Sequence, residues 1–425
     1  MLARGGGPEL ERPAASPAPP APTAQSPTPT PTGTPTPAPT PKPPSLTELL
    51  ETRGRHLAVG ITEPNANFIS PAGGTAPPFA RWRDALARMH PAIYRLMVYW
   101  PAVQPSPNAP ADLGAVNGGC MREIGPCAPF AGIRDQLRAL AARQHEGGWE
   151  GMVVITGTPP WAARPPSGCE RRRIGPTNRM PRTDALGAYR TLVTSILAAA
   201  RAEGATLRYW APWNEPNHPY SSSPQRASCS GAAPSVSAGP YVEVADALRT
   251  ALRRAPGVQR YVVGELATMT RLLPITTTVH EFLAALPASL VCGAAAYTQH
   301  YYVGGEDILG DEDALLRAKH CAHPLPFWIT ETGAGAPHAG QARTAGPAVE
   351  RERCRELDGL LRRWYRDPRI TAAIQYTLRE DDVFPTGLVT TDLSHAYPAL
   401  GEWQRWGLRA RPEITAPPPR RPACG

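Results

Sequence analysis

The chain has 425 residues, a net charge of +8 and 53 prolines. Its basic residues are scattered along predicted helices beside acidic ones instead of forming one stripe, which disfavours a nucleic-acid-binding protein. No run of about 18 apolar residues occurs, so the sequence predicts no transmembrane helix.

The prolines are concentrated near the amino terminus. Between Pro13 and Pro44 almost every residue is Pro, Thr, Ala or Ser. Such a composition cannot form an apolar core and favours the polyproline II conformation. We therefore expect a disordered Pro/Thr-rich stalk at residues 1–47, one folded domain at 48–411 and a Pro/Arg-rich tail at 412–425.

Eight short apolar runs follow the stalk, and most are succeeded by a stretch with apolar residues at helical spacing. The runs are uninterrupted rather than alternating, which is typical of parallel strands buried on both faces. Eight strand–helix units indicate an α/β fold, a closed (β/α)₈ TIM barrel; an open doubly wound sheet is the alternative, without a glycine-rich phosphate loop to support it. The expected strands are His56–Thr62, Ile93–Trp100, Gly151–Thr156, Leu207–Trp213, Tyr261–Leu266 and the runs that begin at Val291, Pro326 and Ala372.

Polar residues stand at the carboxyl ends of these strands, where the active sites of such barrels lie. The fourth strand runs into WNEPN, which contains Glu215, and the seventh into ITETG, which contains Glu331. A pair of carboxylates is what glycoside hydrolysis requires, one to protonate the leaving oxygen and one to attack or to activate water. The acid must keep its proton, so we expect its pKa to be raised by burial and by the other carboxylate. Arg95 and Tyr302 are placed to keep the nucleophile ionised.

The WNEPN and ITETG segments resemble glycoside hydrolase clan A, and GTPPWA, the His-x-Tyr of His300 and Tyr302, and GLVTTDLSHAYPAL are similar to its families 39 and 5. The resemblance implies a retaining mechanism with Glu215 as acid/base and Glu331 as nucleophile. It also implies that Asn214 binds the sugar 2-hydroxyl, that Arg95 and Tyr302 contact the nucleophile, and that His300 lines the adjacent subsite. Clan members commonly place a Trp at the end of the eighth strand, as the floor of the subsite for the cleaved sugar. This chain has Tyr376 there, so either Tyr376 forms that floor or the floor is built differently.

For several further residues the sequence suggests a functional role, a structural role or both. Trp100 and Trp161 either offer flat faces to sugar rings or pack in the barrel. Glu265 is a candidate structural ion-pair partner. Three other acidic residues lie near strand ends and either bind sugar hydroxyls or only keep loops hydrated, namely Glu63, Asp381 and Asp382.

Eight cysteines in mostly polar loops favour disulfides and an oxidising compartment, and none has zinc-like spacing. We expect the pairs Cys120–Cys127, Cys169–Cys229 and Cys321–Cys354, with Cys292 buried and free. A secreted or cell-surface protein follows from the disulfides and the stalk, although Met1–Leu10 has no apolar segment typical of a signal peptide.

The sequence thus predicts a retaining glycoside hydrolase, with residues 48–411 as the catalytic domain, that cleaves a β-linked polysaccharide or oligosaccharide. A transglycosidase that uses the same covalent intermediate and a catalytically silent glycan-binding barrel are the alternatives. No cofactor and no metal site are expected. The expected partner is the carbohydrate itself. We expect the chain to be a monomer that is associated with a cell wall through the stalk.

Overall fold

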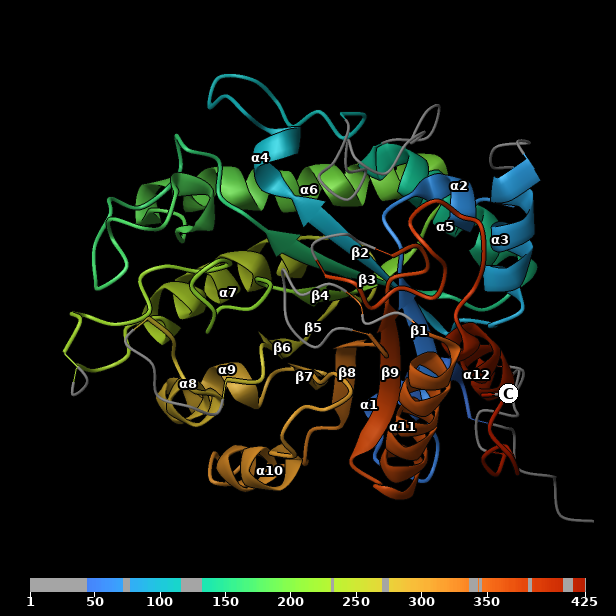
Figure 1. Cartoon of the computed structure of the whole chain (residues 1–425). Helices are drawn as coiled ribbons and strands as arrows, with labels where there is room; N and C mark the ends of the chain where they lie inside the picture. Colours follow the sequence, from blue (N-terminus) through green and yellow to red (C-terminus); the bar gives the residue numbers. More distant parts are fainter. Residues whose placement is uncertain are drawn as a thin grey trace, which may run out of the picture. The chain divides into compact units, whose positions relative to one another are not determined.

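The computed structural model describes residues 44–71, 77–115, 132–230, 233–269, 275–335, 343, 346–380, 384–407 and 416–424. The fold belongs to one compact unit, Pro43–Gly425. Its centre is one sheet of nine parallel strands with helices around it (Figure 1). The strands are β1 Ala58–Thr62, β2 Ile93–Tyr99, β3 Glu150–Thr156, β4 Leu207–Ala211, β5 Arg260–Tyr261, β6 Val263–Leu266, β7 Tyr297–His300, β8 Phe327–Thr332 and β9 Ile370–Tyr376.

The sheet closes on itself through a single stretch of chain. Its order is β5-β4-β3-β2-β1-β9-β8-β7-β6, so the two outermost strands are consecutive in the sequence. Between them Val262 donates its N–H to the carbonyl of Trp210, and Val263 donates to the carbonyl of Ala296. Segment 260–266 therefore serves as one barrel strand that pairs with β4 and with β7. This closure confirms the predicted TIM barrel.

Alternate residues along the strands belong to two separate cores. In β3, Met152 and Val154 join an inner cluster, whereas Val153 and Ile155 join the outer cluster that contains the helices. This period of two is what a barrel requires, with one face filled by side chains and the other covered by helices. Helix α1 (Leu46–Glu51) adds Leu46, Leu49 and Leu50 to the inner cluster. The carbonyl of Leu50 accepts from the indole of Trp328 and the hydroxyl of Thr371, so α1 is bonded to β8 and β9.

Helices occupy most of the connections between strands. One prediction within this pattern was wrong in detail: the sixth unit was expected to begin at Val291, but residues 288–291 form helix α9 and the strand begins at Tyr297. Within the described residues, no helix combines the length and apolar character needed to span a bilayer. The remaining helices are α2 Ala66–Ile69, α3 Pro77–Ala87, α4 Trp100–Val103, α5 Ile133–Glu146, α6 Leu186–Glu203, α7 Ala238–Arg253, α8 Val279–Ala285, α9 Ala288–Val291, α10 Leu309–Arg317, α11 Pro347–Arg366 and α12 Pro398–Gly407.

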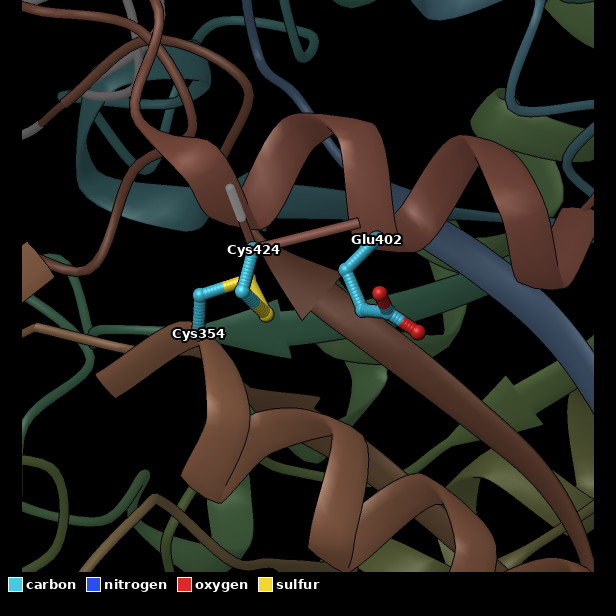
Figure 2. A group of neighbouring side chains, drawn as sticks. All are labelled: Cys354, Glu402 and Cys424. Atoms are coloured by element: carbon cyan, nitrogen blue, oxygen red, sulfur yellow. A yellow bond between two sulfur atoms is a disulfide. The ribbon is translucent and has the colours of Figure 1, made fainter. Parts of the chain in front are cut away.

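Three disulfides link the described cysteines. Cys169–Cys229 confirms one predicted pair, while Cys292–Cys321 and Cys354–Cys424 replace the expected Cys321–Cys354 bridge and the free Cys292. The reason is local: Cys292 follows α9 instead of lying inside a strand, and it faces Cys321 after α10. Cys354, on α11, is bridged to the tail (Figure 2). The expected Cys120–Cys127 pair lies outside the described residues.

Candidate active site

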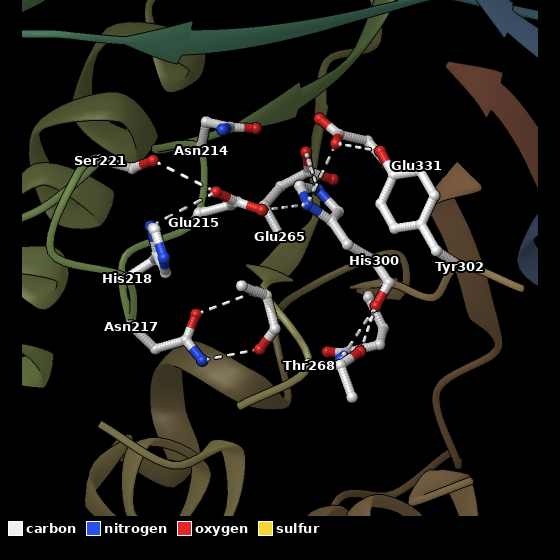
Figure 3. A network of polar contacts seen from close by, with 12 residues as sticks. Asn214, Glu215, Asn217, His218, Ser221, Glu265, Thr268, His300, Tyr302 and Glu331 are labelled. Atoms are coloured by element: carbon white, nitrogen blue, oxygen red, sulfur yellow. Dashed lines mark hydrogen bonds and ion pairs between the residues drawn. The ribbon is translucent and has the colours of Figure 1, made fainter. Parts of the chain in front are cut away.

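The chemistry-bearing residues come from five strands or from the segments directly after them. Glu215 follows β4, Glu265 lies in β6, His300 ends β7, Glu331 lies in β8, and Arg95 lies in β2. Parallel strands present their carboxyl ends at one end of the barrel, so residues distant in sequence meet there. Figure 3 shows the resulting network, with His300 between Glu215 and Glu331.

Glu331 is held by two donors that suit a negatively charged carboxylate. Its Oε1 lies 2.9 Å from Nη1 of Arg95, and its Oε2 accepts a 2.8 Å hydrogen bond from the hydroxyl of Tyr302. Burial and the charge of Glu331 raise the pKa of Tyr302 well above its ordinary value, so the phenol remains a donor. Both contacts match those expected from the sequence.

Arg95 is fully buried and connects several acidic and polar groups. Its Nη2 lies 2.6 Å from Oε2 of Glu265 and donates to Oδ1 of Asn214 at 2.7 Å. Burial alone would lower the pKa of Arg95, but the charges of Glu265 and Glu331 raise it above its ordinary value. A permanently charged guanidinium therefore fixes Glu331 and Asn214 relative to each other.

Glu215 has a different environment on each carboxylate oxygen. Its Oε1 lies 3.0 Å from Nδ1 of His300, and its Oε2 accepts from the hydroxyl of Ser221 at 3.2 Å and lies 4.0 Å from Nδ1 of His218. The side chain is 23% exposed, whereas that of Glu331 is 8% exposed. Glu215 is therefore the member of the pair that is more open to solvent.

The expected rise in the pKa of Glu215 was wrong for this structure. Burial does raise it, but the hydrogen bond and charge of His300 outweigh burial and lower the pKa of Glu215 to about 2. Burial correspondingly lowers the pKa of His300, while Glu331, Glu215 and Glu265 raise it to about 10. The proton of this tightly coupled pair thus resides on His300 when no ligand is bound.

Glu265 completes the network as a buried counterion, the role that the sequence suggested for it. Besides Arg95 it lies 3.4 Å from Nε2 of His300, and although burial raises its pKa, Arg95 and His300 lower it to about 2. Glu215 and Glu265 have φ of 44° and 55°, the left-handed region that non-glycine residues rarely adopt, and the N–H of Glu215 donates to the carbonyl of Glu265. Backbone of this kind persists where surrounding contacts enforce it, as at functional sites.

The two candidate catalytic carboxylates are close. One oxygen of Glu215, Nδ1 of His300 and one oxygen of Glu331 all lie within 4.8 Å of one another. Retaining glycosidases have carboxyl groups about 5–5.5 Å apart, and inverting enzymes about 6.5–9.5 Å apart. The separation of the nearest oxygens of Glu215 and Glu331, below 4.8 Å, is shorter than the spacing in inverting enzymes.

Two groups in the described part of the chain bring three metal-ligating side chains together. The first is Glu215, His300 and Glu331, whose histidine nitrogen facing the carboxylates is the protonated partner of Glu215. The second is Cys354, Glu402 and Cys424, where the two sulfur atoms are joined as a disulfide and offer no thiolate (Figure 2). The absence of a metal requirement stays a prediction.

The aromatic candidates differ in their surroundings. Trp100 is fully buried and packs edge-on against Trp161 and Tyr189, with centroid distances of 5.8 Å to each, so its role is packing. Trp161 is partly exposed, and its indole donates to the carbonyl of Gln104. Tyr376 is also partly exposed and lies 6.0 Å from the ring of Phe384.

Sequence reasoning missed three residues at the site. Phe384 packs 4.7 Å from the ring of Tyr302, and His218 and Ser221 contact Glu215. All three lie in irregular segments, where no periodicity signals which side chains turn inward. Only the closeness of His218 and Ser221 to WNEPN could have indicated them.

The side chain of Glu63 is buried, so it neither keeps a loop hydrated nor binds a sugar hydroxyl in an open site. Its Oε1 accepts from the N–H of Asn65, and its Oε2 accepts from the N–H groups of Leu378 and Arg379. It therefore links the end of β1 to the segment after β9. Asp381 and Asp382 lie outside the described residues.

No family model matches the chain, and no curated protein is similar to it in sequence. Solved structures do share its fold. SrfJ from Salmonella typhimurium is 10% identical with a TM-score of 0.54 over 85% of this chain and 77% of that one. A conserved exported protein from Bacteroides fragilis is 13% identical, with a TM-score of 0.52 over 85% and 80%. The catalytic domain of GH30 xylanase C from Talaromyces cellulolyticus is 15% identical, with a TM-score of 0.51 over 85% and 78%.

Proposed function

We propose that the protein is a retaining glycoside hydrolase that cleaves a β-linked polysaccharide or oligosaccharide by double displacement. The observation that carries this proposal is the pair Glu215 and Glu331, whose oxygens lie within 4.8 Å at the carboxyl ends of β4 and β8. Such a short spacing suits direct attack by one carboxylate on the anomeric carbon.

Glu331 is the nucleophile in this proposal. Arg95 and Tyr302 orient its two oxygens, at 2.9 and 2.8 Å, and leave the carboxylate in one fixed position. Attack forms a covalent glycosyl ester on Glu331. Asn214, held by Arg95 at 2.7 Å, is in place to bond the sugar hydroxyl next to the reacting carbon.

Glu215 is the acid/base, and His300 supplies its proton. The 3.0 Å contact between Nδ1 of His300 and Oε1 of Glu215 lets the proton pass from the imidazolium to the carboxylate, and the protonated Glu215 then donates it to the leaving oxygen. Ester formation removes the negative charge of Glu331, which is the largest of the influences that raise the pKa of His300. In the second step Glu215, again a carboxylate, takes a proton from the attacking water.

The fold shared with a xylanase catalytic domain supports glycosidase chemistry on a β-linked polysaccharide. The three disulfides and the likeness to an exported protein support an extracellular location. We propose further that the chain acts as a monomer, and that the stalk expected at its amino terminus associates it with a cell wall. The transglycosidase alternative uses the same intermediate and differs only in the acceptor.

The test is turnover of a defined panel. Purified protein is incubated with xylan, mannan and β-glucan and with the dinitrophenyl β-glycosides of xylose, mannose and glucose, and products are separated by chromatography. We expect one sugar series to be cleaved by the wild type and not by Glu331→Ala. Chain-length redistribution without net hydrolysis would identify the transglycosidase. Binding without any turnover would contradict the proposal and leave the silent glycan-binding barrel.

A further inference from the structure

A strongly exposed tyrosine stands on the segment that carries Glu215. Of the large apolar side chains in the described residues, Tyr220 is 65% exposed and Val258 is 57% exposed, and all others are more buried. Val258 precedes β5 and so lies at the amino-terminal end of the barrel. Tyr220 follows β4 and lies at the carboxyl-terminal end, five residues after Glu215.

The loop of Tyr220 is tightly bonded on both sides of this residue. The N–H of Ser222 donates to the carbonyl of His218 at 2.8 Å, and the indole of Trp213 donates to the carbonyl of Ser221 at 2.8 Å. The buried carboxylate of Glu170 accepts from the hydroxyl of Ser223 at 2.8 Å and from the N–H of Gln225. The Cys169–Cys229 disulfide joins the same two loops. An exposed aromatic ring on so constrained a backbone presents a preformed surface.

This surface lies on one defined side of the site. Glu215 directs Oε1 toward His300 and Glu331, and Oε2 toward Ser221 and His218 (Figure 3). The ring of His218 in turn lies 5.6 Å from that of Tyr220. These contacts form a chain from Glu331 through His300, Glu215 and His218 to Tyr220. Tyr220 therefore adjoins the carboxylate oxygen of Glu215 that is not bonded to His300.

We infer that Tyr220 is a binding platform for a sugar ring on the leaving-group side of the scissile bond. The inference rests on the proposed function, since the acid/base faces the oxygen of the leaving group and a ring next to the acid/base is within reach of that group. The axial C–H groups of a pyranose form an apolar face, which packs on an aromatic ring while the Tyr hydroxyl stays in solvent. The substrate class is thus a saccharide with further sugar units beyond the cleaved bond, rather than a glycoside of a small alcohol.

The test compares a substrate that reaches Tyr220 with one that cannot. The first is the β-1,4-linked tetrasaccharide of the sugar that the panel identifies. The second is the β-glycosyl fluoride of the same sugar, whose leaving group is a single atom. For Tyr220→Ala we expect the ratio of kcat/KM for the tetrasaccharide to kcat/KM for the fluoride to fall about tenfold, mainly through KM. Tyr220→Phe should retain the ratio, because it keeps the ring. Val258→Ala, an exposed apolar residue at the other end, is the control.

An unchanged ratio in Tyr220→Ala, or an equal fall with both substrates, would overturn the platform. An equal loss in Tyr220→Phe would mean that the hydroxyl is the contact instead of the ring face. These outcomes leave the proposed function standing, since the wild type still cleaves both substrates. Failure of the wild type on every substrate of the panel would reject the proposed function itself, and the platform with it.

Discussion

His300 contacts all three carboxylates of the site, at 3.0 Å from Glu215 and 3.4 Å from both Glu265 and Glu331. Arg95 neutralises one negative charge, so the imidazolium compensates a second and one remains. This balance explains why the proton is held by a histidine whose own burial disfavours charge. In the proposed mechanism, the acid/base Glu215 therefore carries no proton before substrate binds, and the proton that it will donate is held by His300.

Replacing His300 by Gln should change the pH dependence of the reaction. Without the imidazolium, Glu215 must hold the proton alone, and the pKa of about 10 that belongs to His300 is lost. At pH 8 we expect kcat/KM for a saccharide substrate to fall about 100-fold, the usual size of acid catalysis. At pH 5, where a buried carboxyl can keep a proton, the loss should be smaller.

The control for this variant is His218→Gln, because His218 lies 4.0 Å from the other oxygen of Glu215 and should affect the profile less. A loss in His300→Gln that is the same at both pH values would show that His300 only positions Glu215. The measurement is kcat/KM from pH 4 to 9 for both variants and the wild type.

At the scale of elements, Glu63 joins the first and last strands of the barrel. Its carboxylate accepts from three backbone N–H groups, of Asn65, Leu378 and Arg379, at 2.9–3.2 Å. Glu63→Ala would leave these buried donors without an acceptor, and we expect a loss of about 2–3 kcal/mol in the free energy of unfolding. Chemical denaturation measures it. The exposed Glu306→Ala serves as the control, and equal stabilities of the two variants would contradict this role for Glu63.

The strands could be predicted because a buried parallel strand is a continuous apolar run, and the site residues because such strands bring their ends together. Arg95, Asn214, Glu215, His300, Tyr302 and Glu331 meet for that reason. The sixth strand was misplaced since the apolar run from Val291 is longer than the strand that it contains. Disulfide partners and the loop residues His218 and Phe384 depend on how irregular segments fold back, which no period in the sequence encodes.

At the scale of the whole molecule, buried ionisable groups fix how stability depends on pH. Burial raises the pKa of Glu63 and Glu402 to about 7 and that of Glu312 to about 8, from an ordinary value of 4.5. These carboxyls bind protons more tightly in the folded chain, so their contribution to stability falls as pH rises from 4.5 to about 8. His300 acts in the same direction, because its raised pKa gives stability that is complete below 6.5 and is lost as pH rises toward 10.

Glu215 and Glu265 have the opposite effect on the pH dependence of stability. Their pKa values near 2 give stability that is lost as pH falls below 4.5. We therefore expect the melting temperature to be highest near pH 5 and lower at both pH 3 and pH 8. Scanning calorimetry at the three pH values measures this. Glu312→Gln should reduce the difference between pH 5 and pH 8, and a melting temperature that rises over this interval would refute the assignment of the buried carboxyls.

The roles of Glu215 and Glu331 are tested most directly by azide rescue of the two glutamate variants on a dinitrophenyl β-glycoside of the cleaved sugar. In Glu215→Ala the good leaving group departs without acid, the glycosyl ester on Glu331 accumulates, and azide should release a glycosyl azide of retained configuration. In Glu331→Ala no ester can form, so azide should attack directly and give the inverted azide. Nuclear magnetic resonance of the products reads both outcomes. Swapped configurations would reverse the two roles, and undiminished activity in either variant without azide would place the catalytic pair elsewhere.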